Sequence, residues 1–324
     1  MPHYLLTGAG FSRNWGGWLA HEAFEYLLGC AEITAHHRNL LWKHRQLGSG
    51  FEGVLQELRE EYQRDTTSAR ELQTFNNMLI GMFNTMNVAF GDFEPGRHER
   101  AGPQPTHVRD FLCRFDAIFT LNQDTLLEQK YQRTDLLEGS QGGWFGFGSP
   151  GLGEETIGGQ PYASPGVFRP VEPFALRDRY QPYFKLHGSS NWRVLNGSIL
   201  LILGQNKATE IGHIPLLDWY WNEFRQRLAQ SDAHLMIIGY GFRDQHINEI
   251  IHQGTKKGAK LFIIDLDGVD ILDKAPRLIS GNVKTFREDI QDSIIGASRR
   301  PFLSNFTTDA VELKKIQRFF PLFP

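Results

Sequence analysis

The sequence predicts an α/β protein in which helices cover both faces of a parallel sheet. Four short apolar runs are typical of buried parallel strands, because each is rich in Ile, Leu or Phe and ends near Gly, Asn or Asp. Helical patterns stand between them, and this alternation is characteristic of doubly wound sheets. The four runs are Tyr4–Thr7, Ala117–Leu121, Leu235–Tyr240 and Leu261–Leu266.

The first run leads directly into a glycine turn, Gly8-Ala9-Gly10-Phe11-Ser12. Glycine at positions 8 and 10 permits a tight turn and lets backbone N–H groups approach a pyrophosphate. The common dinucleotide fingerprint has a third glycine where this chain has Arg13. The turn alone is therefore a weak indication of a Rossmann-like nucleotide site, and its weight comes from three later segments.

Residues 17–105 are expected to be a helical insertion after this turn. Two stretches place apolar residues three and four positions apart with polar residues between them, and a proline-bearing polar connector returns to the sheet. These segments are Glu52–Arg64, Ser68–Asn87 and Pro95–Pro105. Residues 1–16 and 106–324 are assigned to a Rossmann-like core, with residues 17–105 inserted in the same domain.

Further helical patterns at Trp221–Ala229 and Gln245–Thr255 flank the third strand-like run. Between residues 139 and 167 glycine is frequent. This segment fits a long irregular surface loop, and it also fits a mobile cover whose aromatic side chains close over a ligand. The sequence leaves both interpretations open.

The second run is followed by Asn122-Gln123-Asp124. Open α/β sheets bind their ligands at the carboxyl ends of parallel strands, so an amide and a carboxylate here are candidate ligand contacts. Asp124 also suits the role of a helix cap. The two interpretations are compatible, with Asp124 as the cap and Asn122 in the cleft.

His187 lies between an apolar residue and Gly188, which places its ring at a turn. Its unperturbed pKa suits proton transfer near neutral pH, although most histidines are surface or core residues. The third run ends in Gly239-Tyr240-Gly241, where small residues allow the backbone to touch a ribose or phosphate. The fourth ends in Asp265, which would either accept hydrogen bonds from an adenosine ribose or terminate a turn.

Composition excludes several classes of protein. The chain has 324 residues, a formal net charge of −3 and two cysteines, Cys30 and Cys113. The charge gives no reason to expect nucleic-acid binding or attachment to an anionic membrane. Two cysteines supply neither a disulfide framework nor a four-cysteine zinc site, so no metal is expected. We expect a cytoplasmic protein without a signal peptide or membrane span.

The four segments together resemble the sirtuin-like superfamily, and most of all its divergent bacterial branch found in defence systems against bacteriophage. Sirtuins open the NAD site with a Gly-Ala-Gly-x-Ser turn, hold the nicotinamide ribose and amide with Asn-x-Asp, and use a His-Gly pair as catalytic base. The matching residues here are Gly8–Ser12, Asn122–Asp124, His187-Gly188, and Gly239–Phe242 with Asp265 for the remaining ribose contacts.

The resemblance implies an NAD glycohydrolase that forms nicotinamide and ADP-ribose, with Asn122, Asp124 and His187 as the catalytic residues. Gly8, Ala9, Gly10, Phe11 and Ser12, together with Gly239, Tyr240, Gly241 and Asp265, would bind NAD. The alternative is a non-catalytic sensor of NAD or ADP-ribose. Deacylation is disfavoured because the chain lacks the cysteines of the sirtuin zinc ribbon, and Arg13 disfavours a dehydrogenase.

The same branch implies a toxic effector that depletes cellular NAD during infection. Such an enzyme requires gating, so we expect a homo-oligomer and a separately encoded partner, either helicase-like, Argonaute-like or nucleotide-kinase-like. The helical insertion is the expected contact surface.

Overall fold

Seven parallel strands form the central sheet of the computed structural model, in the order β13-β12-β11-β1-β2-β8-β3. They are β1 (His3–Thr7), β2 (Ala117–Thr120), β3 (Gly146–Gly148), β8 (Tyr180–Lys185), β11 (His234–Ile238), β12 (Lys260–Ile264) and β13 (Ile294–Ser298). The structure describes residues 1–92, 105–132, 143–154, 156–157, 160–161, 166–194, 199–204, 207–278, 284–306 and 308–320.

The strand order is that of a dinucleotide-binding sheet. Counted from β8, the strands run β8-β2-β1-β11-β12-β13, so the chain builds outward from β1 first on one side and then on the other. This is the order 3-2-1-4-5-6, in which ligands bind where the direction of building reverses, here between β1 and β11. The predicted parallel α/β fold and its four strands are confirmed, and the structure adds β3, β8 and β13.

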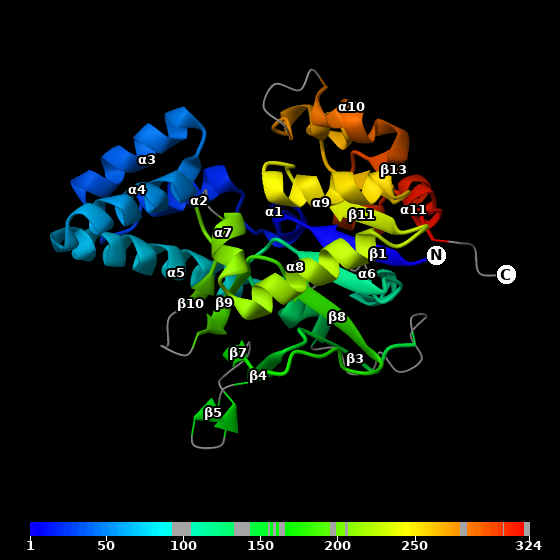
Figure 1. The fold of residues 1–324 in the computed structure, drawn as a ribbon, viewed down its shortest axis with the longest axis horizontal. Helices are drawn as coiled ribbons and strands as arrows, with labels where there is room; N and C mark the ends of the chain where they lie inside the picture. The colour runs from blue at the N-terminus through cyan, green and yellow to red at the C-terminus, as the bar shows by residue number, and fades with distance from the viewer. Residues whose placement is uncertain are drawn as a thin grey trace.

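Helices cover both faces of the sheet (Figure 1). Alternation along β1 divides the core, because Leu5 packs with one cluster of buried residues while Tyr4 and Leu6 pack with the other. The second cluster includes side chains of α8 (Pro215–Leu228) and α9 (Gln245–Lys256). The first includes side chains of α6 (Pro105–Leu112) and α11 (Ala310–Gln317).

The segment between β1 and β2 is helical in its described part. Its helices are α1 (Ala9–Ser12), η1 (Arg13–Trp15), α2 (Ala20–Leu28), α3 (Ala35–Leu47), α4 (Gly50–Arg64), η2 (Thr66–Ser68) and α5 (Ala69–Asp92), followed by α6. Of these, α2, α3, α4 and α5 gather on one side, at the left of Figure 1. The two predicted amphipathic stretches correspond to α4 and α5. The predicted connector Pro95–Pro105 lies outside the described residues, except that Pro105 begins α6. The division into core and insertion stays a prediction.

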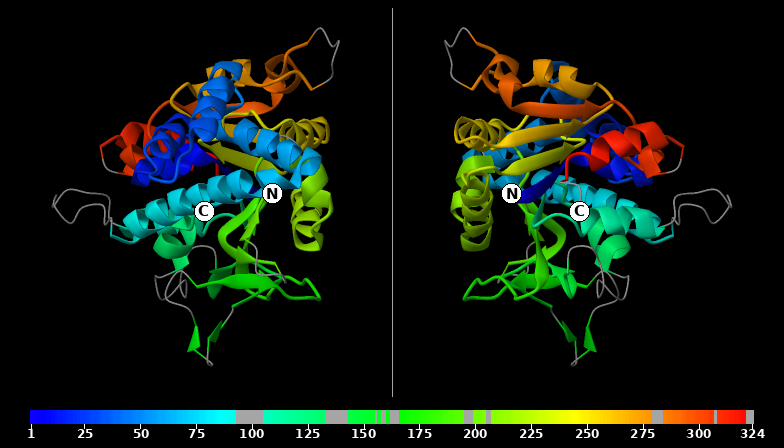
Figure 2. Two further views of the ribbon diagram at one scale, coloured as in Figure 1. Left: turned by 90° about the vertical axis from the view of Figure 1, so that its left-hand side faces the viewer. Right: turned by 90° about the vertical axis from the view of Figure 1, so that its right-hand side faces the viewer.

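A second, smaller sheet of order β10-β9-β7-β4 lies below the main sheet in the side views (Figure 2). Its strands are β4 (Leu152–Glu154), β7 (Phe168–Pro170), β9 (Gly188–Arg193) and β10 (Ile199–Leu201), and β5 (Thr156–Ile157) pairs with β6 (Gln160–Pro161). Part of the glycine-rich segment is therefore strand rather than irregular loop, because β3 joins the main sheet and β4 joins the smaller one. Residues 139–142, 155, 158–159 and 162–165 lie outside the described part, and a covering motion stays a prediction.

The remaining described elements are short helices and turns that follow β2. They are the π-helical turn η3 (Glu128–Gln132), α7 (Lys207–Gly212), η4 (Gly268–Lys274), α10 (Phe286–Ile290), η5 (Gln291–Ser293) and η6 (Phe302–Phe306). Within the described residues, no helix is both long and apolar enough to cross a membrane.

Candidate functional site

The two glycine turns meet where β1 and β11 end. The Gly8 N–H donates to Ile238 O at 3.0 Å, and the Gly10 N–H donates to Gly239 O at 2.9 Å. A Cβ added at Gly10 would lie 2.7 Å from the Gly239 Cα, and Gly239 itself has φ +62°. Glycine is therefore required here so that one turn can pack on the other. The N–H groups of Gly8 and Gly10 already have backbone partners, and a pyrophosphate cradle formed by this turn stays a prediction.

Two other predicted contacts face the core. Phe11 is buried, and its ring lies 5.1 Å from the Trp15 ring. Tyr240 is buried as well, and its hydroxyl donates to Asp244 O and to Asn248 Oδ1, both at 3.0 Å. Both side chains are therefore enclosed by the protein, and their contact with a ligand stays a prediction.

The open positions of the two turns are Ala9, Gly241 and Arg243. Ala9 and Arg243 are exposed. A Cβ at Gly241 would meet only the Arg243 Cγ, at 4.0 Å. Between them, Phe242 is fully buried with φ +52°, a backbone conformation uncommon for a bulky residue. The buried Phe242 ring anchors this loop while its neighbours on either side remain accessible to a ligand.

A hydrogen-bond network joins the first glycine turn to the end of β2. The Asn122 amide Nδ2 donates to Gly8 O and to Ser12 Oγ, each at 2.9 Å. The Ser12 hydroxyl in turn donates to Asp124 Oδ2 at 2.8 Å. Asp124 Oδ1 accepts from the Leu126 N–H at 3.0 Å, so this carboxylate also starts the following turn as predicted. Ser12 is thus brought together with Asn122 and Asp124, which lie 110 and 112 positions further along the chain.

Gln123, for which no role was predicted, holds the turn that carries His187. Its Nε2 donates to His187 O at 3.0 Å and to Ile202 O at 2.7 Å. Gly188 is also required in this turn, because it has φ +76° and a Cβ there would lie 2.2 Å from Leu200 O. The His-Gly pair therefore allows the chain to pass from β8 into β9 directly against β10.

His187 is buried, with 3% of its surface exposed. Its Nε2 lies 3.0 Å from the Nε2 of His246, on the first turn of α9. Burial, together with the positive charge of Lys207, lowers the pKa of His187 well below its ordinary value. Burial likewise lowers the pKa of His246 to about 4. Both rings are therefore neutral at neutral pH, and one of the two Nε2 atoms donates to the other.

His187 and Asn122 come from neighbouring strands but do not contact each other. The pairing of Thr120 with Lys185 brings the ends of β2 and β8 side by side, two residues before the predicted catalytic pair. The Asn122 amide is directed to the first glycine turn, whereas the His187 ring contacts His246. No hydrogen bond between these two side chains is recorded in the part of the chain that the structure describes.

Residues 116–277 match the family model of the SIR2-like domain, which is half of the chain. The chain belongs to the SIR2-like domain family. SIR2-like domains are NAD-dependent enzymes, and the matched residues include Asn122, Asp124, His187 and Asp265. The first glycine turn lies outside the match. No curated protein matches the chain.

In this SIR2-like chain Asp265 lies at the carboxyl end of β12, two strands from β1. Its Oδ1 accepts from the Asp267 N–H at 2.9 Å, and its backbone carbonyl accepts from the Gly268 N–H at 2.8 Å. Burial raises the pKa of this carboxyl. Asp265 thus closes a turn, which is one of the two interpretations that the sequence left open. Its contact with a ribose stays a prediction.

An ionic cluster links α9 to the helices between β1 and β2. Lys207 Nζ lies 2.8 Å from Asp244 Oδ1 and 2.9 Å from Glu52 Oε1. Burial opposes the charge of Lys207, but the two carboxylates outweigh it and raise the pKa of the ammonium. Burial also acts to raise the pKa of Asp244, but the nearby His187 and Lys207 outweigh it and lower that pKa. Asp244 is therefore an ionised carboxylate beside the two histidines.

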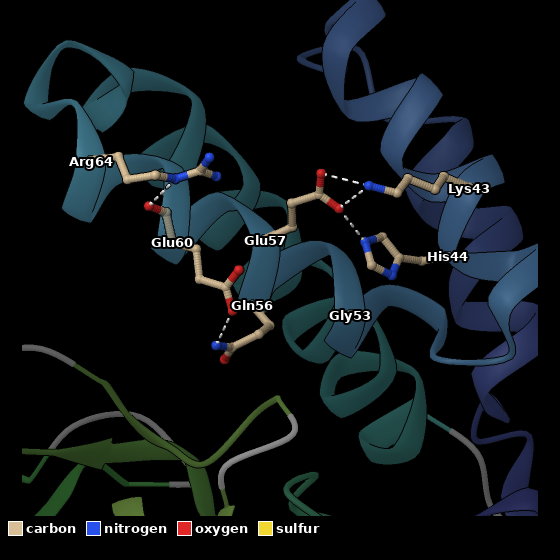
Figure 3. A pocket seen from close by; sticks show the side chains of 7 residues that line it. All are labelled: Lys43, His44, Gly53, Gln56, Glu57, Glu60 and Arg64. Atoms are coloured by element: carbon tan, nitrogen blue, oxygen red, sulfur yellow. Dashed lines mark hydrogen bonds and ion pairs between the residues drawn. The ribbon is translucent and has the colours of Figure 1, made fainter.

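Two cavities lie away from the strand ends. One of about 330 Å³ lies on α3 and α4 (Figure 3), where its polar side chains pair with one another: Glu57 binds Lys43 at 2.7 Å and His44 at 2.8 Å. The other, of about 310 Å³, lies between the two sheets and includes Glu128 and Trp192. Neither includes a predicted site residue, so we assign the candidate site to the strand ends by their chemistry rather than by cavity size.

Proposed function

We propose that this SIR2-like chain hydrolyses NAD to nicotinamide and ADP-ribose. The observation that carries the proposal is the hydrogen-bond network of Ser12, Asn122 and Asp124 beside the reversal point of the sheet. It ties the end of β2 to the turn after β1, and β1 is one of the two strands between which a dinucleotide binds in this fold. A neutral imidazole, His187, stands at the next strand end.

In the proposed reaction the bond between the nicotinamide nitrogen and the ribose C1′ breaks, and positive charge develops on the ribose as in other glycosyl cleavages. Nicotinamide leaves with the bonding electron pair, and water adds to C1′. Asn122 orients the ribose and the water, and His187 accepts the proton that the water loses. A general base must be neutral before the reaction, and the lowered pKa of His187 meets that requirement.

The remaining contacts follow from the open positions of the crevice. The pyrophosphate would lie against Ala9 and Gly241, with the exposed Arg243 beside it. Asp265 would accept hydrogen bonds from the adenosine ribose and would repel the 2′-phosphate of NADP. Contact of Asp124 with the nicotinamide carboxamide stays a prediction, because both its oxygens accept bonds from the protein here.

The test is release of nicotinamide from NAD by the purified chain, measured by chromatography. We expect His187→Ala and Asn122→Ala to lower the rate by about 10²-fold or more, the range typical of a lost general base. His252→Ala, on the same helix as His246 but outside the cluster, is the matched control and should retain the wild-type rate. Circular dichroism establishes that each variant is folded. Wild-type turnover by folded His187→Ala would refute the assignment.

A non-catalytic sensor of NAD or ADP-ribose is the second candidate. It is favoured by one observation, the contact of the His187 Nε2 with His246 rather than with Asn122. A sensor would bind NAD, detected by calorimetry, and leave it intact over hours. An enzyme would release nicotinamide once His187 parts from His246.

The cellular role that we propose comes from the resemblance described above. The chain would act as an antiphage effector that depletes NAD in the infected cell. It would work as a homo-oligomer with a separately encoded helicase-like, Argonaute-like or nucleotide-kinase-like partner. Measuring nicotinamide release over a series of protein concentrations tests the oligomer, because activity that depends on assembly rises faster than the protein concentration.

A further inference from the structure

We propose that His187, His246 and Asp244 form a binding site for one divalent transition-metal ion such as Zn²⁺. One ligand atom from each side chain lies within 4.8 Å of the other two. Two imidazole nitrogens and one carboxylate oxygen are a donor set that Zn²⁺ and its neighbours in the first transition row prefer. His187 comes from the turn after β8, and the other two come from the start of α9, so only the tertiary fold assembles the site.

The spacing of the two histidines supports this assignment. Their Nε2 atoms face each other at 3.0 Å. Two ligands at the usual Zn–N distance of 2.0–2.1 Å and a tetrahedral angle are about 3.3 Å apart, so a small separation of the rings admits the ion.

The positive charge of Lys207 opposes the binding of a metal cation, and nearby carboxylates reduce this repulsion. Lys207 binds Asp244 Oδ1, but it also binds Glu52 at 2.9 Å. Its ammonium therefore keeps a carboxylate partner when Asp244 turns toward the ion. The cluster thus places two acidic side chains around one ammonium, so Lys207 is not left without a partner when a cation binds Asp244.

The immediate environment suits a partly closed site. The Trp221 ring packs on His246 with centroids 5.3 Å apart. Its buried indole Nε1 has no hydrogen-bond partner in the described part of the chain, so a donor beside the cluster is available to a water on the ion. Three protein ligands and a water are the usual coordination of an open zinc site.

Metal binding would also remove the imidazole from proton transfer, since the ion takes the His187 Nε2 lone pair. This consequence rests on the proposed NAD hydrolysis, whereas the binding site itself does not. An inhibited state with metal and an active state without it would then exchange at His187.

The test uses the full chain, purified without a polyhistidine tag and stripped of metal with a chelator. We expect one Zn²⁺ per chain by competition with a chromophoric chelator, and a Co²⁺ adduct with the visible absorption of a tetrahedral site. His246→Gln should weaken binding by more than about 100-fold, because changes to outer-shell partners alone cost 10–100-fold. His252→Gln, on the same helix, should bind as the wild type does.

Two further readouts keep the outcome clear. Zn²⁺ should raise the melting temperature of the wild type and of His252→Gln, and leave that of Asp244→Asn nearly unchanged. Substoichiometric binding by the wild type, or equal affinity in folded His246→Gln, would overturn the site. The activity assay is separate: loss of NAD hydrolysis on adding Zn²⁺ supports the inhibitory consequence, while a wild type that binds zinc but never consumes NAD refutes only the proposed function.

Discussion

Gly10→Ala distinguishes glycine that serves turn packing from glycine that serves a helix or a ligand. Gly10 lies inside α1, where alanine is intrinsically favoured over glycine by about 1 kcal/mol. The added Cβ would, however, lie 2.7 Å from the Gly239 Cα, at least 0.7 Å short of the 3.4 Å at which ordinary contact begins. Both atoms belong to the backbone, so neither side can yield by rotating a side chain.

The expected loss follows from these terms. Overpacking costs about 1–3 kcal/mol, and separation of the turns weakens the hydrogen bonds from Gly8 to Ile238 and from Gly10 to Gly239, each worth about 1 kcal/mol. We therefore expect a net destabilisation of about 2 kcal/mol, measured by urea unfolding followed through circular dichroism. Gly241→Ala is the matched control and should change stability by less than about 0.5 kcal/mol. A Gly10→Ala variant as stable as the wild type would refute the packing argument.

Three further predictions concern other sites. Arg243→Ala should raise the KM for NAD several-fold with little change in kcat, because Arg243 is exposed beside the open face of Gly241. Steady-state kinetics test this, and a fall in kcat alone would contradict it. Burial and the neighbouring His234 lower the pKa of His3 from 6.5 to about 4, so the unfolded chain binds the proton more readily than the folded chain does. The contribution of His3 to stability is therefore fully present above pH 6.5, and the free energy of unfolding falls by up to about 3 kcal/mol as the pH decreases to 4. His3→Phe should reduce that decline in acid unfolding curves, and an unchanged decline would exclude His3 as its source. Lys185→Met should lower the free energy of unfolding in urea by about 3–5 kcal/mol, because it leaves the buried Glu128 carboxylate without its partner at 2.8 Å. A loss below about 1 kcal/mol would contradict a structural role for the pair.

Much of the fold was predictable from the sequence, because buried parallel strands produce continuous apolar runs. The four strands predicted in that way all belong to the central sheet. β8 was not predicted because its sequence contains Gln181 and Lys185, whose buried polar groups form hydrogen bonds instead of apolar contacts. β13 was not predicted because Gly296 and Ser298 interrupt its apolar run.

The candidate site was only partly predictable, for a related reason. The ends of buried strands are visible in the sequence as apolar runs followed by polar residues, so Asn122, Asp124 and His187 could be predicted as candidate site residues. The contact of His187 with His246 spans 59 positions and depends on how α9 packs over the sheet, which no local pattern encodes. The packing role of the glycines was not predicted either, because the contact of Gly10 with Gly239 joins two turns that are far apart in the sequence.

The most direct test of NAD hydrolysis at these strand ends is mass spectrometry of the products formed from NAD in water enriched in ¹⁸O. Hydrolysis at the ribose C1′ predicts nicotinamide without label and ADP-ribose carrying one ¹⁸O atom, with both absent in Asn122→Ala. NAD that stays intact while the wild-type chain binds it would contradict the account, as would nicotinamide release in which no ¹⁸O enters the ADP-ribose product.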